Sequence, residues 1–377
     1  MDATERLLQW ATAQDVVLDG IEAKPLPGRG IGIVATRALE ANEDVLTVPS
    51  ALLRTLATTP KRVARNLAGA SVQALLAADL CLDDAALAAP WRAVLPPRAA
   101  LEAAMPICWP RELRALLPPT ARRLCDGQRA RFDRDWALVA AAYPDGVVTR
   151  ADFLYAWNLV NSRTFYHVTP QTETTLPRDD RIALQPVADL FNHAPQGGCS
   201  VAFDHADYTF TTTRPHAPGD ELFICYGPHS NDFLLVEYGF TLAAGNPWDE
   251  TCLDPYLCPV FSAEQRERLQ DAGFWERYML DAKTACFRTQ VALRILCLTP
   301  SQWCAVLDGT RGEDQDQDVA DAQLLKVLKR YKKDLRAKLV EVDRIQEDAG
   351  GHAKACLRSR WIQIKELVVT TISRLQK

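Results

Sequence analysis

Short strand-like segments fall into two groups along this chain, and a long helical stretch separates the groups. In the first group, 28–35 is predicted to be a glycine-rich loop that enters a strand, and 45–49 a strand that ends at a proline. Strands and helices do not alternate regularly, which excludes a doubly wound parallel sheet and predicts an α+β fold with a split β core. The second group of strands is predicted near 182–188, 199–203, 207–213 and 221–225.

Helical periodicity dominates the remainder of the chain. Apolar residues recur every three or four positions in 4–18, which predicts a short N-terminal helix. After about residue 255 the pattern is helical, with one amphipathic helix predicted over 321–346. The acidic run 311–318 before it is predicted to be a solvated loop. Between the two groups of strands, helices are predicted over 67–88, 128–142 and 150–162.

Charge and composition narrow the class of protein. Of the 377 residues, 48% are hydrophobic and 24% are charged, which is sufficient for a sizeable core of two or three structural units. A net charge of −5 argues against a nucleic-acid binder, which would carry a strong basic excess. No apolar run is long enough to span a membrane, and Asp2 and Glu5 stand where a signal peptide would be basic and then apolar.

The eleven cysteines are scattered and odd in number, and no Cys-x-x-Cys pair occurs among them. This pattern favours reduced thiols in a cytosolic or nuclear protein over a disulfide scaffold or a zinc site. Cys225 lies beside Tyr226 in an apolar segment, so we interpret it as a buried, inert thiol rather than a nucleophile. The absence of a Gly-x-Ser-x-Gly motif leaves a serine hydrolase without support.

The glycine-rich loop alone indicates little about function, but it is the first of four motifs that are informative together. They follow one another in a fixed order and lie on both sides of the helical stretch. They are Gly-Arg-Gly-Ile-Gly at 28–32, Asn-Leu-Val-Asn-Ser-Arg-Thr-Phe at 158–165, Leu-Gln-Pro-Val-Ala-Asp-Leu-Phe-Asn-His at 184–193, and Gly-Asp-Glu-Leu-Phe-Ile-Cys-Tyr-Gly at 219–227, followed by Ser-Asn at 230–231 and Glu-Tyr-Gly-Phe at 237–240.

Together these motifs resemble the SET-domain methyltransferases, in the branch typified by the Rubisco large-subunit methyltransferase. The resemblance covers about 20–250. It implies a split SET β-fold with a pseudoknot, a helical insert and an all-α C-terminal substrate-binding domain. The implied parts are the N-terminal helix with the first part of the SET core at 1–55, the helical insert at 56–180, the second part of the core at 181–250, and the substrate-binding domain at 251–377.

The resemblance implies binding of S-adenosyl-L-methionine, with S-adenosyl-L-homocysteine as the product. The backbone at Gly30, Ile31 and Gly32 would approach the methionyl part, since glycine has no Cβ to obstruct it. Arg163 resembles the arginine that pairs with the cofactor carboxylate. From the residues alone, a turn glycine and a surface arginine at a helix end remain alternatives.

Asn192 and His193 match the family's Asn-His pair, which contacts the cofactor and in this fold threads beneath the segment that contains Tyr226. Tyr226 is the implied catalytic residue, and it would also contact the cofactor. Methyl transfer to an amine is an in-line displacement, in which a phenol can align the neutral amine without a metal or a covalent nucleophile. A turn and a packed tyrosine at a sheet edge are the structural alternatives.

Phe165, Asp189 and Tyr238 match positions that line the lysine channel in this branch, although each could equally belong to a core. The resemblance implies a protein-lysine N-methyltransferase, monomeric and located in the cytoplasm or nucleus. Its partner would be a protein that presents a lysine, with no nucleic acid and no membrane. No Cys-x-Cys follows residue 240, which favours a non-histone target such as a ribosomal or translation-related protein. A histone-lysine or protein-histidine methyltransferase and a non-catalytic SET-like binding module remain alternatives.

Overall fold

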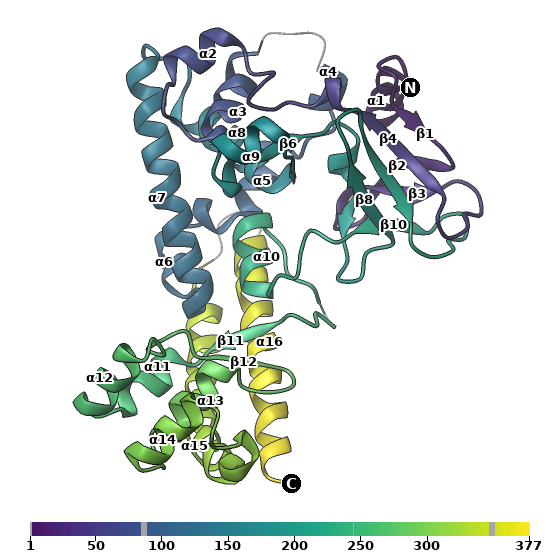
Figure 1. Cartoon of the computed structure of the whole chain (residues 1–377). Coiled ribbons are helices and arrows are strands. Elements are labelled where there is room, and N and C mark those ends of the chain that lie inside the picture. Colours follow the sequence, from purple (N-terminus) through teal and green to yellow (C-terminus); the bar gives the residue numbers. More distant parts are fainter. Residues whose placement is uncertain (1, 84–88, 244, 347–350) are drawn as a thin grey trace. The chain divides into compact units, whose positions relative to one another are not determined.

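The computed structural model describes residues 2–83, 89–243, 245–346 and 351–377. The chain forms two compact units (Figure 1). Unit 1 comprises Met1–Glu102 with Gly127–Pro228, and unit 2 comprises Ala103–Asp126 with His229–Lys377. Segment 103–126, which lies inside the expected helical insert, therefore belongs to the same unit as the C-terminal region. The family's own domain boundaries stay a prediction.

Unit 1 contains two four-stranded sheets, in the orders β1-β4-β9-β8 and β2-β3-β10-β7. Each sheet combines strands from both groups of the sequence; for example, β3 pairs antiparallel with β10. The split α+β core is therefore confirmed. A third, two-stranded sheet joins β5 to β6. The strands are β1 Val17–Leu18, β2 Ile21–Leu26, β3 Gly30–Ala35, β4 Asp44–Pro49, β5 Thr164–Tyr166, β6 Ile182–Leu184, β7 Asn192–His193, β8 Cys199–Phe203, β9 Asp207–Thr212 and β10 Glu221–Ile224.

Strand β9 shows how these elements form. Its residues alternate strictly, with Tyr208, Phe210 and Thr212 buried and their neighbours half-buried, as expected for one covered face of a sheet. Strand β7 runs parallel to β10, with Asn192 opposite Phe223. The two segments expected to form the pseudoknot therefore lie side by side.

Several helices of unit 1 begin at side-chain caps. The Thr149 side chain accepts from the Asp152 backbone N–H at the start of α8 (Arg150–Arg163), a helix that ends at Arg163. The predicted helix 4–18 is shorter than expected, because Asp15 has a left-handed backbone (φ 62°) and the chain continues as β1. The predicted helix 67–88 begins late, and 84–88 lies outside the described residues. The other helices of unit 1 are α1 Ala3–Thr12, α2 Lys61–Asn66, α3 Val72–Leu82, α4 Ala89–Arg92 and α9 Pro170–Thr175. Two further helices, α5 Arg98–Ala104 and α7 Pro119–Ala142, have residues in both units.

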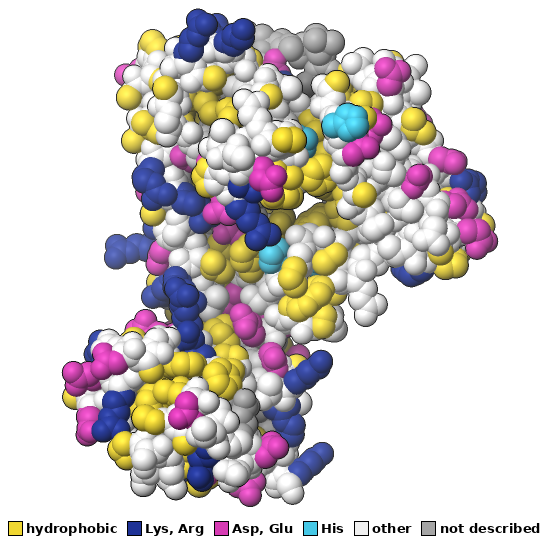
Figure 2. Space-filling model, viewed as in Figure 1, with side chains coloured by type: hydrophobic (Ala, Val, Ile, Leu, Met, Phe, Trp, Pro, Cys, Tyr) yellow, Lys and Arg dark blue, Asp and Glu magenta, His cyan; other side chains and the backbone are white. Residues whose placement is uncertain are grey.

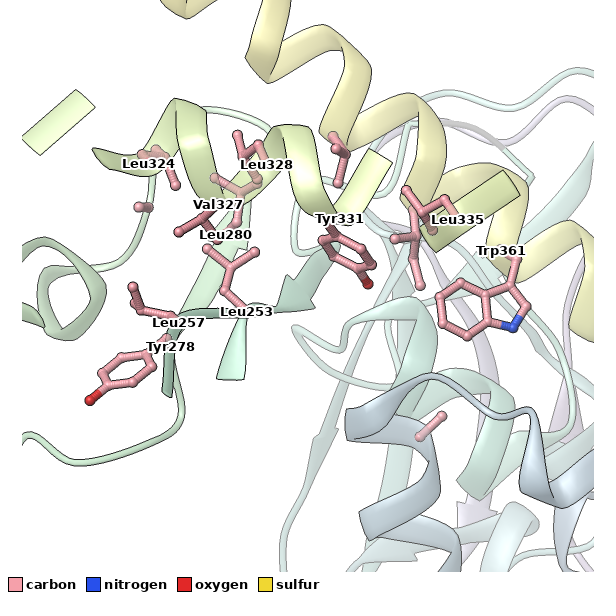
Figure 3. Packing of buried hydrophobic residues seen from close by; sticks show 14 of the residues in the cluster. Leu253, Leu257, Tyr278, Leu280, Leu324, Val327, Leu328, Tyr331, Leu335 and Trp361 are labelled. Carbon is pink, nitrogen blue, oxygen red and sulfur yellow. The ribbon is translucent and has the colours of Figure 1, made fainter. Parts of the chain in front are cut away.

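Unit 2 is built around α15 (Gln317–Arg344) and α16 (His352–Leu375). Tyr331 and Trp361 from these helices lie in one buried hydrophobic cluster with Leu253 and Leu280 (Figure 3). Two strands, β11 (Glu250–Cys252) and β12 (Met279–Asp281), pair antiparallel in this otherwise helical region, so the expected all-α tail contains a small sheet. The shorter helices are α6 Arg111–Ala115, α10 Asn231–Tyr238, α11 Asp254–Leu257, α12 Ala263–Asp271, α13 Phe287–Arg294 and α14 Pro300–Leu307.

The acidic run before α15 is not a plain solvated loop, which corrects the prediction. Asp316 is buried, and its carboxylate accepts from Arg311 Nε at 2.6 Å and Arg311 Nη2 at 2.8 Å. Pairing with the arginine lowers the pKa of Asp316 and makes burial of the carboxylate possible.

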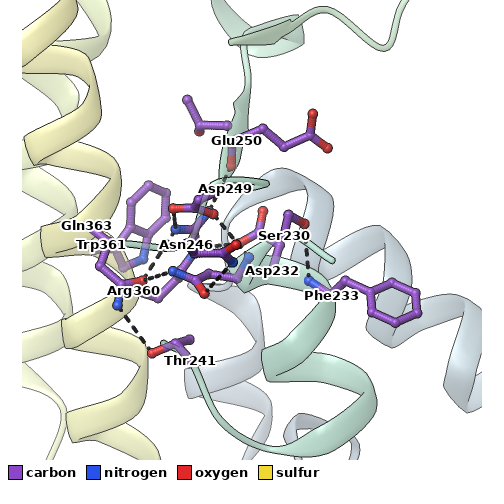
Figure 4. A network of polar contacts seen from close by, with 12 residues as sticks. Ser230, Asp232, Phe233, Thr241, Asn246, Asp249, Glu250, Arg360, Trp361 and Gln363 are labelled. Atoms are coloured by element: carbon purple, nitrogen blue, oxygen red, sulfur yellow. Dashed lines mark hydrogen bonds and ion pairs between the residues drawn. The ribbon is translucent and has the colours of Figure 1, made fainter. Parts of the chain in front are cut away.

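A fully buried arginine holds another part of unit 2 together (Figure 4). Arg360 on α16 donates from Nε to Asp232 Oδ1 at 2.7 Å and from Nη1 to Asp249 Oδ2 at 2.8 Å. Its Nη2 donates to the Glu250 carbonyl at 2.9 Å. Each of the three guanidinium nitrogens therefore has a partner, and α16 is tied to α10 and β11.

All eleven cysteines are free thiols, as expected. Cys225 is exposed just after β10, so the expectation of a buried thiol there was wrong. None of the helices in the described ranges combines the length and apolar character needed to cross a membrane. Within the same ranges, His, Cys, Asp and Glu side chains form no group of three or more that could hold a metal ion. On the face in Figure 2, Lys and Arg side chains are dispersed among acidic and apolar ones.

Candidate functional site

The glycine-rich segment lies at the start of β3 in unit 1. Gly30 has a left-handed backbone (φ 75°), and no atom lies within 4 Å of the position a Cβ would take. At Gly32 a Cβ would lie 2.9 Å from both Asn192 Nδ2 and Glu221 Oε1, which leaves no room for a side chain. The segment therefore combines an open approach at Gly30 with close packing at Gly32.

Asn192 connects three strands of this sheet. Its Nδ2 donates to Glu221 Oε1 on β10 at 2.8 Å and reaches the Ile31 carbonyl on β3 at 3.4 Å. Glu221 also pairs with Arg29 at 2.8 Å. The structure thus brings the predicted glycine segment and the Asn-His pair together. The strand expected near 182–188 covers only β6, Ile182–Leu184, because Val187 has a positive φ of 75° and 188–190 forms a 3-10 turn.

Tyr226 lies directly beyond β10 and contacts the Asn-His pair. Its backbone N–H donates to His193 Nδ1 at 3.1 Å, and the two rings lie 5.1 Å apart between centroids. The phenol donates to the Phe191 carbonyl at 2.6 Å, which fixes the side chain. Tyr226 is half-buried, and a backbone carbonyl holds its hydroxyl in place.

Arg163 lies at the end of α8, where its Nη1 donates to both the carbonyl oxygen of Asp189, at 2.9 Å, and Asp189 Oδ2, at 3.1 Å. Its Nε and Nη2 make no hydrogen bond to the described residues. The Asp189 side chain is wholly buried, and Oδ2 also accepts from the indole N–H of Trp91 at 3.1 Å. Burial raises the pKa of Asp189, while Arg163 and the Trp91 hydrogen bond act in the opposite direction.

Phe165 lies on β5 and packs edge-on against Phe210, with ring centroids 5.9 Å apart. Phe210 stacks in turn on Phe191 at 5.0 Å. Since Phe191 supplies the carbonyl that binds the Tyr226 hydroxyl, a chain of contacts links Phe165 to Tyr226. Phe165 is half-buried, a position compatible both with a channel wall and with the rim of a core.

Tyr238 belongs to unit 2, where it is the last residue of α10. It is half-buried in an aromatic group with His229, Phe233 and Phe240, at centroid distances of 6.3, 6.4 and 6.3 Å. Its assignment to a lysine channel with unit 1 residues stays a prediction.

Comparison with known proteins identifies the family. The model of the SET domain matches residues 30–227, more than half of the 377 residues. This chain belongs to the SET-domain family. All the predicted site residues except Tyr238 lie within the matched SET domain.

Relatives with curated names share the SET domain to different extents. The ribosomal lysine N-methyltransferase set11 of Schizosaccharomyces pombe is 36% identical over 155 residues, which cover 41% of this chain and 39% of that protein. SET domain-containing protein 4 of Homo sapiens is 26% identical over 379 residues, covering 91% of this chain and 84% of that protein. The chain therefore matches well under half the length of the fission yeast enzyme, and most of the human protein.

Solved structures share the fold over the whole chain. A structure of Rubisco LSMT bound to AdoMet matches with a TM-score of 0.64 and 15% identity, over 100% of this chain and 92% of that one. The SET domain of LSMT bound to MeLysine and AdoHcy matches with a TM-score of 0.65 and 16% identity, over the same shares of the two chains. At this identity the likeness establishes the fold, in agreement with the expected Rubisco LSMT-like architecture.

The SET domain also holds site residues that sequence reasoning missed. Trp91 contacts Asp189 from α4, almost a hundred positions away, and no local pattern signals that contact. Glu221 stands within a motif that was recognised, but the hydrogen bond from Asn192 appears only when the strands pair. Gln185 is fully buried, and neither polar atom of its side chain is hydrogen-bonded to the described residues.

Proposed function

We propose that this SET-domain protein is an S-adenosyl-L-methionine-dependent protein-lysine N-methyltransferase that acts on a non-histone protein. The observation that carries this proposal is that hydrogen bonds and strand pairing join Tyr226, His193 and Asn192 to the glycine segment. These contacts join three of the four motifs, and Asn192 and Ile31 are 161 positions apart in the sequence.

The residues present fit the cofactor. The open backbone at Gly30 can lie against its methionyl part. Arg163 has two guanidinium nitrogens free of hydrogen bonds to described residues, which suits a carboxylate. Gly32, Asn192 and His193 complete the proposed binding set with Ile31. S-adenosyl-L-methionine would supply a methyl group on a positively charged sulfur, and S-adenosyl-L-homocysteine would be the product.

Tyr226 is the proposed catalytic residue. A lysine amine must be neutral and in line with the methyl group to attack it, so positioning and a desolvated environment contribute most of the rate. The phenol, held by the Phe191 carbonyl, would align the amine and place its dipole near the transferring charge. The proton released by the amine would leave to solvent.

Phe165, Asp189 and Tyr238 are the proposed lining of the lysine channel. The aromatic face of Phe165 suits the alkyl stem of lysine. Asp189 provides a buried carboxylate beside the fully buried Ala188. A small, apolar residue next to the acid favours a slender alkylamine over an imidazole, which supports lysine rather than histidine as the acceptor.

The substrate class rests on the relatives. Two of them, from Schizosaccharomyces pombe and Saccharomyces cerevisiae, are named ribosomal lysine N-methyltransferases, and solved neighbours hold lysine or methyllysine. A ribosomal or translation-related protein is therefore the proposed substrate. The enzyme is proposed to be a monomer in the cytoplasm or nucleus. No role for nucleic acid or membrane is proposed.

The first test is calorimetric titration of S-adenosyl-L-methionine and S-adenosyl-L-homocysteine, followed by transfer of labelled methyl groups to purified ribosomal proteins. Tyr226→Phe should bind both ligands and transfer about a hundredfold more slowly. The control is Tyr278→Phe in unit 2, since the buried Tyr278 hydroxyl has no hydrogen bond to described residues and its loss should leave transfer intact. Failure of the wild type to bind either ligand would reject the proposal in favour of a non-catalytic binding module.

A further inference from the structure

Asp189 in unit 1 has a carboxylate oxygen that is buried without a hydrogen bond to the described residues. Asp189 is enclosed by Trp91, which is 1% exposed, and by Arg163, and both donate to the same atom, Oδ2. Its Oδ1 is buried and has no hydrogen bond to the described residues. A carboxylate oxygen left in this condition costs about 1–3 kcal/mol, so its retention needs an explanation.

A second tryptophan–aspartate pair in unit 1 shows the ordinary structural arrangement. Trp157 is fully buried and donates from its indole N–H to Asp135 Oδ2 at 2.9 Å. The Ser71 hydroxyl lies 3.1 Å from both Asp135 oxygens, so neither oxygen is left without a donor. Two buried indole–carboxylate hydrogen bonds thus occur in one unit, and the carboxylate is satisfied in one and incomplete in the other.

The backbone conformation and its hydrogen bonds also constrain the position of Asp189. Two residues earlier, Val187 has φ 75° and ψ −53°, a conformation that a β-branched residue adopts only under strain. The Asp189 N–H donates to the Gln185 carbonyl at 3.1 Å, and Arg163 holds the Asp189 carbonyl at 2.9 Å. Backbone and side chain are therefore both constrained, which leaves Oδ1 as the one acceptor available to a ligand.

We propose that Trp91 is a positioning residue for substrate recognition: by holding Oδ2, its indole N–H presents Oδ1 of Asp189 to an N–H of the acceptor lysine amine. This inference rests on the proposed function and extends it to a residue of the helical insert. The ligand that it assigns to Oδ1 is the primary amine of the acceptor lysine. The cofactor also carries a primary ammonium, and the separate Kd values for lysine and for S-adenosyl-L-homocysteine distinguish the two amines.

The pH dependence follows from the same contacts. Arg163 on α8 is the charged group that acts on Asp189, and the Trp91 hydrogen bond from α4 lowers its pKa. Removing that hydrogen bond raises the pKa of Asp189, so the carboxylate becomes protonated at higher pH than in the wild type. The acid limb of kcat/KM against pH should therefore move to higher pH.

The test uses L-lysine as the probe, titrated into the full chain with S-adenosyl-L-homocysteine present. Trp91→Phe should raise the Kd for L-lysine about tenfold, while the Kd for S-adenosyl-L-homocysteine stays within about twofold of the wild type. Trp157→Phe is the matched control, because it removes the same kind of hydrogen bond from Asp135 and should leave both constants unchanged. If Trp91→Phe does not fold, site-specific replacement of Trp91 by benzothienylalanine removes the N–H at nearly constant volume.

Two results would overturn the inference. Equal changes in Trp91→Phe and Trp157→Phe would show a general packing effect. An unmoved acid limb of kcat/KM in the Trp91 variant, with normal wild-type transfer, would show that Asp189 does not meet the amine through Oδ1. Failure of the wild type to bind S-adenosyl-L-homocysteine would instead reject the proposed function itself, so the two failures can be told apart.

Discussion

Each unit pairs an arginine with a buried carboxylate, and the two clusters differ in how many of their polar atoms are hydrogen-bonded. In unit 2, Arg360 is fully buried and uses all three guanidinium nitrogens on Asp232, Asp249 and the Glu250 carbonyl. In unit 1, Arg163 is 21% exposed and uses only Nη1, while Asp189 keeps one oxygen without a hydrogen bond to described residues.

The difference separates a structural cluster from a site. Burying charges costs free energy that only full pairing offsets, so a saturated cluster such as that of Arg360 has no capacity left for a ligand. An incomplete cluster loses part of that compensation and regains it when a ligand arrives. Among the described residues, the Arg163–Asp189 pair leaves two guanidinium nitrogens and one carboxylate oxygen without hydrogen bonds, which match the carboxylate of the proposed cofactor and the amine of the proposed substrate.

The largest expected effect is on stability in unit 2. Arg360→Met should lower the free energy of unfolding by about 3–5 kcal/mol, because it leaves the buried Asp232 and the half-buried Asp249 without their cation. Urea denaturation followed by circular dichroism measures this change. Arg358 lies two residues before Arg360 on the same helix and forms an ion pair with Asp343 in which both side chains are about half exposed. Arg358→Met breaks this pair and should cost no more than about 1 kcal/mol. Similar losses for the two variants would show that the Arg360 cluster stabilises unit 2 no more than an exposed ion pair does.

The fold was predictable from the sequence wherever hydrophobic periodicity is long. The amphipathic pattern over 321–346 corresponds to α15, and the split between two groups of strands is real. Short elements were missed, since β11 and β12 have three residues each and carry no readable period. The N-terminal helix was predicted too long. It ends at Thr12, and the left-handed residue Asp15 then precedes β1, a change of direction that hydrophobicity does not encode.

The candidate site was likewise predictable only in part from the sequence. Motif resemblance placed Gly32, Asn192 and Tyr226 together, and the strand pairing of β3, β7 and β10 brings their segments into contact. The partners of Asp189 could not be predicted, because Trp91 reaches it from an insert helix with no motif of its own. Burial of Asp316 and exposure of Cys225 were likewise misjudged, since both depend on neighbours that only the folded chain supplies.

The next largest effect is expected for Arg163 in unit 1, the counterpart of Arg360. Arg163→Met should cost about 1–3 kcal/mol of stability, less than Arg360→Met, because Asp189 can take up a proton when its cation is removed. The same variant should weaken S-adenosyl-L-methionine binding by about tenfold or more through loss of the proposed carboxylate contact. Calorimetry on Arg163→Met and Arg358→Met, measured side by side, checks both parts. A normal cofactor Kd in Arg163→Met would remove the arginine from the proposed site.

The smallest effect tests whether Asp189 is kept at a cost to stability. Asp189→Asn preserves the shape and still accepts from Trp91, so it should change the free energy of unfolding by only about 1 kcal/mol or less near neutral pH. Burial raises the folded-state pKa of Asp189 above its usual value of 3.8, so its contribution to stability is fully present below that value. The contribution is lost as pH rises through the folded pKa. The asparagine variant avoids the loss and should gain stability relative to the wild type as pH increases, which denaturation midpoints from pH 4 to 8 would show. A variant that instead becomes relatively less stable as pH increases would mean that Arg163 more than compensates the buried charge, and that Asp189 is a structural partner like Asp232.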